Sequence, residues 1–253
     1  MFSLMRNLRR NLIENNSFGK YALYAFGEVV LIVLGILAAL WIDNWNQEQL
    51  EAKREQFYLT GLKEEFQASL SKLDTLMAVN RKSYQTAEDL LQRIPGAYIG
   101  EEAVLSKMLI GALTYEIVYN PNNSLLKELI NSGHLETLTN PMLRRHLTSW
   151  ESFLESVRRQ EENLRLQRQH TTDLLRGPEG SIRTIAVYSQ VDPELRLNPE
   201  EPLYSNLDLL KSREFENNFL LFTLDAKNME MVHYIPLRQE ITTILGLIEA
   251  GLE

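Results

Sequence analysis

A single carboxylate, Glu28, lies in the apolar stretch Tyr21–Ile42, which contains no other Asp, Glu, Lys, Arg or His. A protonated acid in such a stretch can donate a hydrogen bond to the same residue of a neighbouring copy of the chain. A ring of such acids can instead line a wet path that carries protons or cations. A third interpretation assigns no chemistry, because a carboxylate near the membrane surface can extend to water. The residue type and its position leave all three interpretations open.

Two small residues share the helical face of Glu28. Gly35 and Ala39 lie within about 20° of Glu28 around a helix that turns by 100° per residue. A pair of small residues four apart lets two helix backbones approach closely in lipid. Glu28, Gly35 and Ala39 are therefore the predicted contact between transmembrane helices, and Glu28 is also the candidate proton acceptor.

A second carboxylate, Glu230, precedes His233 with the Glu-x-x-His spacing found in di-metal helical proteins. Such a centre needs a second Glu-x-x-His pair and two further glutamates on facing helices. The chain has no cysteine, which excludes disulfides and Cys-based metal sites, so we expect no metal site and no cofactor. A second pair is missing because Glu does not stand three residues before any other histidine: His134, His146 and His170.

No P-loop, nucleophile elbow or zinc-protease helix occurs in the sequence. We therefore predict no catalytic residues and do not expect an enzyme. A run of arginines is interleaved with acids, which predicts a solvated helix face with ion pairs and not a ligand site. The residues of this run are Arg158, Arg159, Arg165 and Arg168, with Glu155, Glu161 and Glu162.

Charge is divided unevenly along the chain, whose formal net charge is −8. Residues 1–42 carry +2, and residues 43–253 carry −10. Nucleic-acid binding depends on neutralising phosphates, so we expect no nucleic-acid partner for so acidic a body. The small basic end is instead suited to an anionic membrane surface.

The stretch Tyr21–Ile42 has the length and composition of a transmembrane helix. It contains 22 residues, and about 20 apolar residues cross a bilayer core. A buried helix of a soluble protein would show a polar stripe, which residues 29–42 lack. A cleaved signal peptide would have a shorter apolar run that ends in small residues, whereas this run ends in WIDNWN. We therefore predict an uncleaved transmembrane helix over residues 18–45, with the lipid bilayer as a partner.

The charges that flank this helix predict its orientation. Basic residues precede it and acidic residues follow it, which places the N-terminus in the cytoplasm and residues 46–253 in the periplasm of a Gram-negative cell. Residues 1–17 are predicted either as a basic amphipathic helix on the cytoplasmic surface or as a flexible basic tail. The residues predicted at the membrane surface are Arg6, Arg9, Arg10, Lys20, Trp41 and Trp45.

Periodicity and capping residues predict helices throughout residues 46–253. Apolar residues recur every three or four positions over residues 46–94, with interruptions at Ser69 and Asn80. Further helices are predicted over about 101–119, from Asn123 or Ser124 to Gly133, and from Asn140-Pro141 to about 175.

The region near 177–206 interrupts this helical pattern. Three prolines stand in residues 181–206, so we expect a long loop there, with at most one short strand around Ile182–Val187. The last helical stretch starts near Ser205 and is broken or kinked at Pro236. The predicted fold is all-α, with one N-terminal transmembrane helix followed by an extramembrane antiparallel helical bundle.

Three stretches of the chain resemble an uncharacterised family of bacterial single-pass membrane proteins, known as a domain of unknown function. The most specific is KYALYAFGEVVLIVLGILAALWIDNWNQ, in which Gly27-Glu28, Gly35 and the tetrapeptide DNWN occur together. The resemblance implies a short basic N-terminus, a span with the Gly-Glu pair and a helical body, but no catalytic or binding residues. The other two stretches are LLKELINSGHLETLTNPMLRRHLTSW, residues 125–150, and SREFENNFLLF, residues 212–222.

These observations predict a bitopic inner-membrane protein that self-associates through its transmembrane helix and acts as a binding, sensing or scaffold component. The expected partners are the lipid bilayer, further copies of the chain, and other membrane or periplasmic proteins. The alternative is a subunit of an oligomeric complex that conducts protons or cations through Glu28.

Overall fold

The computed structural model describes residues 18–94, 101–192, 194–195, 197–198 and 201–252. Within these ranges the regular elements are all helical and no strand occurs, which confirms the all-α prediction. The chain divides into two compact units, Met1–Glu55 and Gln56–Glu253. The predicted basic segment 1–17 lies outside the described residues.

Helix α2 (Phe18–Arg93) contains no proline and passes through both units. In the first unit, every side chain from Glu28 to Arg54 is exposed, including the large apolar side chains between Val29 and Ile42. Near the N-terminus, this helix is long and apolar enough to span a membrane, and none of its apolar window is buried. The predicted long apolar N-terminal helix is therefore confirmed.

In the second unit, α2 buries one face at the predicted three-to-four spacing, with Leu59, Leu62, Phe66 and Leu73 almost fully buried. The two predicted interruptions of this seam are buried as well. Ser69 donates a hydrogen bond to the backbone carbonyl of Asn122, and Asn80 donates one to the carbonyl of Ala226 at 2.8 Å. Both polar residues therefore anchor other segments to α2.

Helix α3 (Glu102–Leu113) ends six residues before the predicted boundary, and residues 115–123 are not helical. The β-branched pair Ile117-Val118 disfavours continued helix, and Pro121 restricts the residue before it to extended conformations. The carbonyl of Ala112 accepts a hydrogen bond from the Ser83 hydroxyl of α2, which satisfies one of the last carbonyls of α3. The prediction of helix up to residue 119 is wrong.

Helix α4 (Ser124–Asn131) begins where predicted, but the side chain of Asn123 makes no capping hydrogen bond. The carboxylate of Glu65 on α2 accepts hydrogen bonds from the first backbone N–H groups of α4 instead, at 2.7 Å from Leu125 and 3.2 Å from Leu126. Gly133 then adopts a positive φ of 74° and separates α4 from the short helix η2 (His134–Thr137).

Helix α5 (Pro141–Arg176) has the predicted start, because the side chain of Asn140 accepts hydrogen bonds from the N–H groups of Met142 and Leu143 and Pro141 stands in the first turn. The next segment differs from the prediction. Residues 182–189 form helix α6 (Ile182–Ser189) and not a strand.

Two features explain α6. The Ser181 side chain accepts a hydrogen bond from the Thr184 N–H, which caps the first turn. Thr184 and Ile185 are buried, and α6 packs against α3. Tertiary packing therefore overrides the β-branched composition that suggested a strand.

The chain ends in η3 (Leu207–Lys211), α7 (Arg213–Asn228), the π-helix η4 (Met229–Tyr234) and α8 (Ile235–Leu252). The predicted interruption near Pro236 takes the form of this π-helix. Proline lacks an N–H, and its ring displaces the carbonyl four residues earlier, so the wider turn immediately before it accommodates the defect. The chain continues into α8 without a break.

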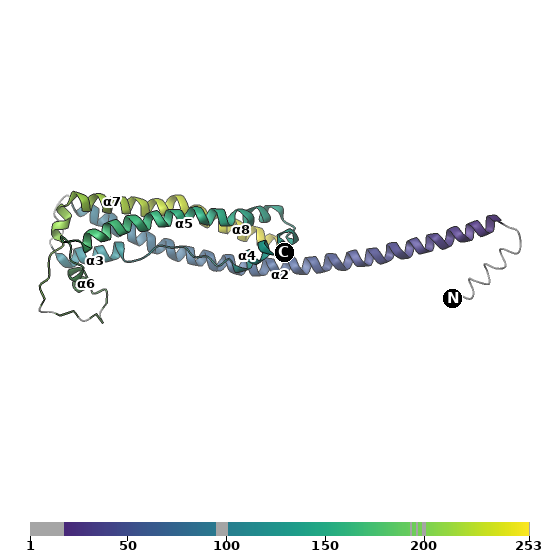
Figure 1. Ribbon diagram of the computed structural model, residues 1–253, viewed down its shortest axis with the longest axis horizontal. Coiled ribbons are helices and arrows are strands. Elements are labelled where there is room, and N and C mark those ends of the chain that lie inside the picture. Colours follow the sequence, from purple (N-terminus) through teal and green to yellow (C-terminus); the bar gives the residue numbers. More distant parts are fainter. Residues whose placement is uncertain (1–17, 95–100, 193, 196, 199–200, 253) are drawn as a thin grey trace. The chain divides into compact units, whose positions relative to one another are not determined.

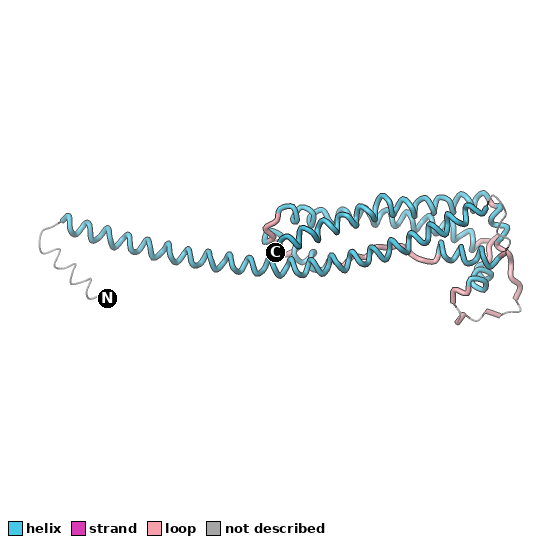
Figure 2. The backbone as a smooth tube through the Cα atoms, turned by 180° about the vertical axis from the view of Figure 1, so that it is seen from behind, coloured by secondary structure: helices cyan, strands magenta, loops and turns pink. Residues whose placement is uncertain are grey.

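In the second unit, the long helices α5, α7 and α8 and the later part of α2 lie side by side (Figures 1 and 2). Their shared core includes Trp150, whose ring packs edge-on against Phe66 at a centroid distance of 5.1 Å. Phe215 and Phe219 stack at 5.4 Å. Helices α3 and α6 pack together beside this core.

Candidate functional site

The residues predicted for the transmembrane contact lie on α2 in the first unit. Glu28 and Ala39 are exposed, and a side chain added at Gly35 would meet no atom within 4 Å. Their role as a contact between copies of the chain stays a prediction. Trp41 and Trp45 are 71% and 56% exposed. The other predicted membrane-surface groups lie outside the described residues: Arg6, Arg9, Arg10 and the side chain of Lys20.

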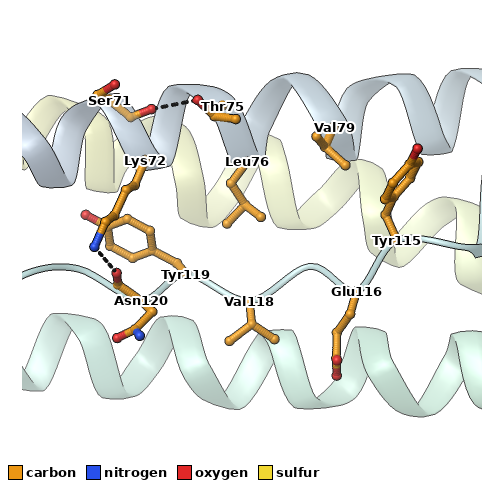
Figure 3. A pocket seen from close by; sticks show the side chains of 10 residues that line it. All are labelled: Ser71, Lys72, Thr75, Leu76, Val79, Tyr115, Glu116, Val118, Tyr119 and Asn120. Carbon is orange, nitrogen blue, oxygen red and sulfur yellow. Dashed lines mark hydrogen bonds between the residues drawn. The ribbon is translucent and has the colours of Figure 1, made fainter.

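In the second unit, the most site-like feature is an extended segment, residues 114–123, which we call the strap. It connects α3 to α4 and lies between α2 and α5, to both of which it is hydrogen-bonded (Figure 3). Buried and exposed side chains alternate along it, as on a half-buried strand. Ile117, Tyr119 and Pro121 are buried, whereas Glu116, Val118 and Asn120 are exposed.

Polar groups of α2 hold one side of the strap. The Ser69 hydroxyl donates to the carbonyl of Asn122 at 3.2 Å and accepts from its N–H at 3.1 Å. The Tyr119 hydroxyl donates to the carbonyl of Ser69 at 3.1 Å. The Lys72 ammonium donates to the carbonyl of Asn120 at 3.3 Å. The bonds of Ser69 and Lys72 satisfy strap backbone groups that a helix would have satisfied internally, and the Tyr119 bond ties a strap side chain to α2.

Two buried charged residues of α5 hold the other side. The Glu161 Oε1 atom accepts a hydrogen bond from the backbone N–H of Tyr119 at 2.8 Å and another from the Tyr234 hydroxyl at 2.7 Å. The guanidinium of Arg168 donates to the carbonyl of Tyr115. The strap is thus joined through Glu161 to the π-helix η4 as well as to α5.

Burial changes the acid–base properties of this network. It raises the pKa of the Glu161 carboxyl, although the hydrogen bonds from Tyr234 and Tyr119 oppose the effect. It also raises the pKa values of the Tyr119 and Tyr234 hydroxyls, which therefore stay protonated and act as donors. Burial lowers the pKa of Arg168. The network is therefore suited to holding the strap in place.

A groove of about 580 Å³ lies between the strap and α2 (Figure 3). Its walls are mainly apolar, with half-buried Leu76 and Val79 on α2 facing the strap. The Tyr115 ring lies against α2, whereas the Glu116 carboxylate points toward α5 (Figure 3). The volume falls in the range of small-molecule sites, about 300–1,000 Å³. The lining residues are Ser71, Lys72, Thr75, Leu76, Val79, Tyr115, Glu116, Val118, Tyr119 and Asn120.

The two α5 residues that hold the strap, Glu161 and Arg168, were not identified from the sequence, which assigned both to a solvated helix face. That interpretation is wrong for these two residues, which are 4% and 8% exposed, but the exposed pairs Arg158–Glu151 and Arg165–Glu162 fit it. The signal that identifies them is heptad spacing, because both fall on the buried seam of α5. This seam is Leu147, Trp150, Leu154, Val157, Glu161, Leu164, Arg168, Thr171 and Leu175.

Glu230 and His233 have separate environments. Glu230 is buried and forms an ion pair with Arg81 of α2, whereas His233 is half-buried, and burial lowers its pKa. No group of three or more His, Cys, Asp or Glu side chains that could hold a metal ion occurs among the described residues. Arg81 therefore takes the role of partner to the Glu230 carboxylate.

Comparison with known proteins gives one match. The model of a family of unknown function, DUF6090, matches residues 28–156. This region includes Glu28, Gly35, Ala39, the strap and the start of α5, but not the stretch 212–222. None of the curated proteins and none of the solved structures matches the chain.

Proposed function

Because the chain belongs to the family of unknown function DUF6090, we propose from its own residues that it is a single-pass membrane protein whose extramembrane helical bundle binds a ligand or partner, as a sensor or scaffold. The proposal has three parts: the membrane span, the bundle with its groove, and self-association through the span. Each part has its own supporting observation and its own test.

The exposure of the apolar side chains between Val29 and Ile42 is the observation that carries the proposal. The twelve strongly apolar residues between Leu23 and Ile42 favour insertion into a bilayer by roughly 4–7 kcal/mol in total, against a cost of about 3 kcal/mol for Glu28. Glu28 is off the centre of the span, which reduces its cost further. A bilayer therefore supplies the environment that the sequence composition of this segment requires.

The basic residues before the span support a cytoplasmic N-terminus and a periplasmic second unit. Protease added to spheroplasts tests this orientation. We expect the second unit to be digested while a short N-terminal fragment survives. A second unit that is protected until the membrane is dissolved would refute the orientation.

Ion pairs between the long helices support an antiparallel bundle. From residue 63 to residue 88 of α2, the ion-pair partners run backwards along the chain, from residue 249 of α8 to residue 227 of α7. Three of the four pairs are exposed and add little stability, but the order of all four reports the direction of the helices. The pairs are Lys63–Glu249, Asp74–Arg238, Arg81–Glu230 and Glu88–Lys227.

Self-association is supported by the common face of Glu28, Gly35 and Ala39 on α2. Because the chain has no cysteine, single cysteines at positions 35 and 39 can be crosslinked in membranes without background. We expect disulfide-linked dimers from Gly35→Cys and Ala39→Cys. Leu37→Cys is the matched control, since residue 37 lies about 180° from Glu28 around the helix. Equal crosslinking at all three positions, or none at any, would contradict a specific contact.

Glu28→Gln separates this contact from ion conduction. The amide keeps the size and the hydrogen-bonding capacity of the side chain but cannot carry a proton. The structural role predicts crosslinking at position 35 within about twofold of the unsubstituted Glu28 background. The alternative, a conducting complex, predicts a proton or cation flux in liposomes that Glu28→Gln abolishes while crosslinking persists.

The groove supports the binding role. Val79→Trp places a large ring in the groove, and Leu224→Trp places the same ring on an exposed position of α7. We expect the unsubstituted chain and Leu224→Trp to retain the same molecules when purified from membranes and analysed by mass spectrometry, and Val79→Trp to lose them. Identical retained molecules in all three preparations would count against a binding role for the groove.

A further inference from the structure

A second cavity, of about 360 Å³, adjoins the groove and shares Tyr115 with it. It lies between α2 and α3, and we call it the lysine cavity, because Lys82 and Lys107 contribute the charges of its wall. The other lining residues are Thr86, Met108, Ile110, Gly111, Tyr115 and Ser189.

The two cavities open along one face of α2. Thr75 and Val79 line the groove, and Lys82 and Thr86 line the lysine cavity. These four residues fall within about 60° of one another around the helix. From Ser71 to Thr86 the lined face extends about 22 Å along the axis. One chain of a membrane lipid spans half of the hydrocarbon core of about 30 Å, so this face is long enough for such a chain.

The groove offers apolar contacts to a chain. Besides Leu76 and Val79, it exposes the side chains of Tyr115 and Val118, which are 54% and 53% exposed. Its one carboxylate, Glu116, points toward α5 (Figure 3) and interacts electrostatically with Arg165 and Arg168 there. The side of the strap that faces α2 across the groove therefore presents no carboxylate among the groove-lining residues.

The lysine cavity offers positive charge. No carboxylate lines it, and neither Lys82 nor Lys107 forms an ion pair with an acid of the described residues. The Ser189 hydroxyl oxygen is buried and has no hydrogen-bond partner within the described part of the chain. Residues 56–253 contain 20 Lys and Arg against 28 Asp and Glu, so a cavity wall with two ammonium groups and no carboxylate has the opposite charge to the unit as a whole. Two cations and a free hydroxyl suit a carboxylate head group.

We propose that the groove and the lysine cavity together bind a long-chain fatty acid anion, a ligand class that rests on the binding role proposed above. The acyl chain lies along Leu76 and Val79, beside Tyr115. The carboxylate accepts hydrogen bonds from the ammonium groups of Lys82 and Lys107. At the opposite end of the groove, Lys72 is already bonded to the strap carbonyl of Asn120 and takes no part in head-group binding.

A photoreactive fatty acid tests the proposal in native membranes, with the full-length chain. The probe is myristate that carries a diazirine on its chain, and the control probe is the monoacylglycerol of the same acid, which has an uncharged head group. Labelled peptides are identified by mass spectrometry. Labelling of the groove peptides is divided by labelling of the apolar part of α2, residues 29–42, which corrects for probe dissolved in the bilayer.

We expect the acid to label the groove peptides at least 10-fold more than the uncharged probe. In the double variant Lys82→Met/Lys107→Met, labelling by the acid should fall at least 10-fold, and excess unlabelled myristate should suppress it in the unsubstituted chain. Lys127→Met is the matched control, because it removes an exposed lysine of α4 that lines neither the groove nor the lysine cavity, and its labelling should stay within twofold. A further variant, Lys72→Met, tests the opposite end of the groove. Both lysines of the cavity are exposed, so the double variant should keep its far-ultraviolet circular dichroism.

Three outcomes would overturn the proposal. Equal labelling by both probes shows that the groove takes an apolar chain without reading its head group. A loss in Lys72→Met in place of the double variant puts the head group at the other end. Groove peptides that neither probe labels exclude lipid chains altogether. In each case the binding role proposed above would still stand if Val79→Trp lost molecules that Leu224→Trp retains. If those molecules were peptides, they would identify a protein partner.

Discussion

Replacing Tyr234 by Phe removes one hydroxyl from the centre of the strap network and leaves the ring in place. The Tyr234 hydroxyl is the donor of a 2.7 Å hydrogen bond to Glu161, and both residues are buried. Hydrogen bonds to charged groups contribute about 1.5–3 kcal/mol, so we expect the free energy of unfolding to fall by about that amount. For a unit of this size, 1 kcal/mol corresponds to about 2–4 °C, which predicts a decrease in Tm of about 3–12 °C.

The assay uses the full chain in detergent micelles at pH 8. The three tryptophans are Trp41, Trp45 and Trp150, of which Trp150 is buried in the second unit. Replacing Trp41 and Trp45 by Phe makes fluorescence report on the second unit alone. Unfolding by urea and by heat then gives the free energy and the Tm of this unit.

Tyr204→Phe is the matched control, because Tyr204 is 69% exposed. Its effect should stay below about 0.5 kcal/mol, as for most surface substitutions. A Tyr234→Phe variant that is equally close to the unsubstituted chain would refute the assignment of Glu161 and Tyr234 as a stabilising link between α5 and η4.

Three further predictions concern the second unit. Burial raises the pKa of Glu161 above 4.5 in the folded chain, so the folded chain binds this proton more tightly than the unfolded chain does. The stability of the unsubstituted chain relative to Glu161→Gln should therefore fall as pH rises from about 4.5 through the folded pKa. Urea unfolding midpoints of both chains at pH 4 and pH 8 measure this change, and a difference that stays constant contradicts the pKa assignment. Asn140→Ala should lower the free energy of unfolding in urea by about 1 kcal/mol, because two N–H groups of α5 lose their capping acceptor. An unchanged urea midpoint would show that this cap does not stabilise the unit. Gly180→Ala should destabilise the second unit by about 1–3 kcal/mol, because the new Cβ would lie 2.4 Å from the Leu175 carbonyl oxygen. Gly246→Ala should instead stabilise α8 by about 0.5–1 kcal/mol, because no atom lies within 4 Å of the new Cβ. Thermal unfolding should show Tm changes of opposite sign for the two variants, and changes of the same sign would contradict the geometry.

Local patterns were sufficient for α2, for the start of α5 and for the end of α4. The apolar seam of α2, the Asn140-Pro141 start of α5 and the stop at Gly133 each depend on residues close together in the chain. Hydropathy likewise identified the apolar part of α2, because a long apolar run needs no tertiary contact to be recognised.

The strap and α6 could not be predicted in this way. Residues 114–123 stay extended because Ser69, Glu161 and Arg168, which lie far away in the sequence, satisfy their backbone groups. Helix α6 depends on burial of Ile185 against α3. Propensity alone cannot anticipate contacts of this kind.

The candidate site was recoverable only in part. A polar residue on an apolar seam, such as Glu161 on α5, marks a buried anchor once the heptad spacing is followed through it. The groove and the lysine cavity carry no local signal, because separate parts of the chain line them: α2 and the strap line the groove, and α2 and α3 contribute most of the lysine cavity. Lys82 and Lys107 become neighbours of one cavity only in the folded structure.

The π-helix η4 holds one residue more than an α-helix would need to join α7 to α8 in the same orientation. The core-facing side chains of α8, such as Leu237 and Ile241, are fully buried, as is Phe219 of α7. Removing one residue from Met229–Tyr234 would convert this segment to ordinary α-helix and keep α8 facing the core, whereas removing one residue from α8 itself would rotate the part that follows by about 100° about its axis. That rotation would bring the apolar stripe of α8 into water, so single-residue deletions within α8 should be far less tolerated than deletions within Met229–Tyr234.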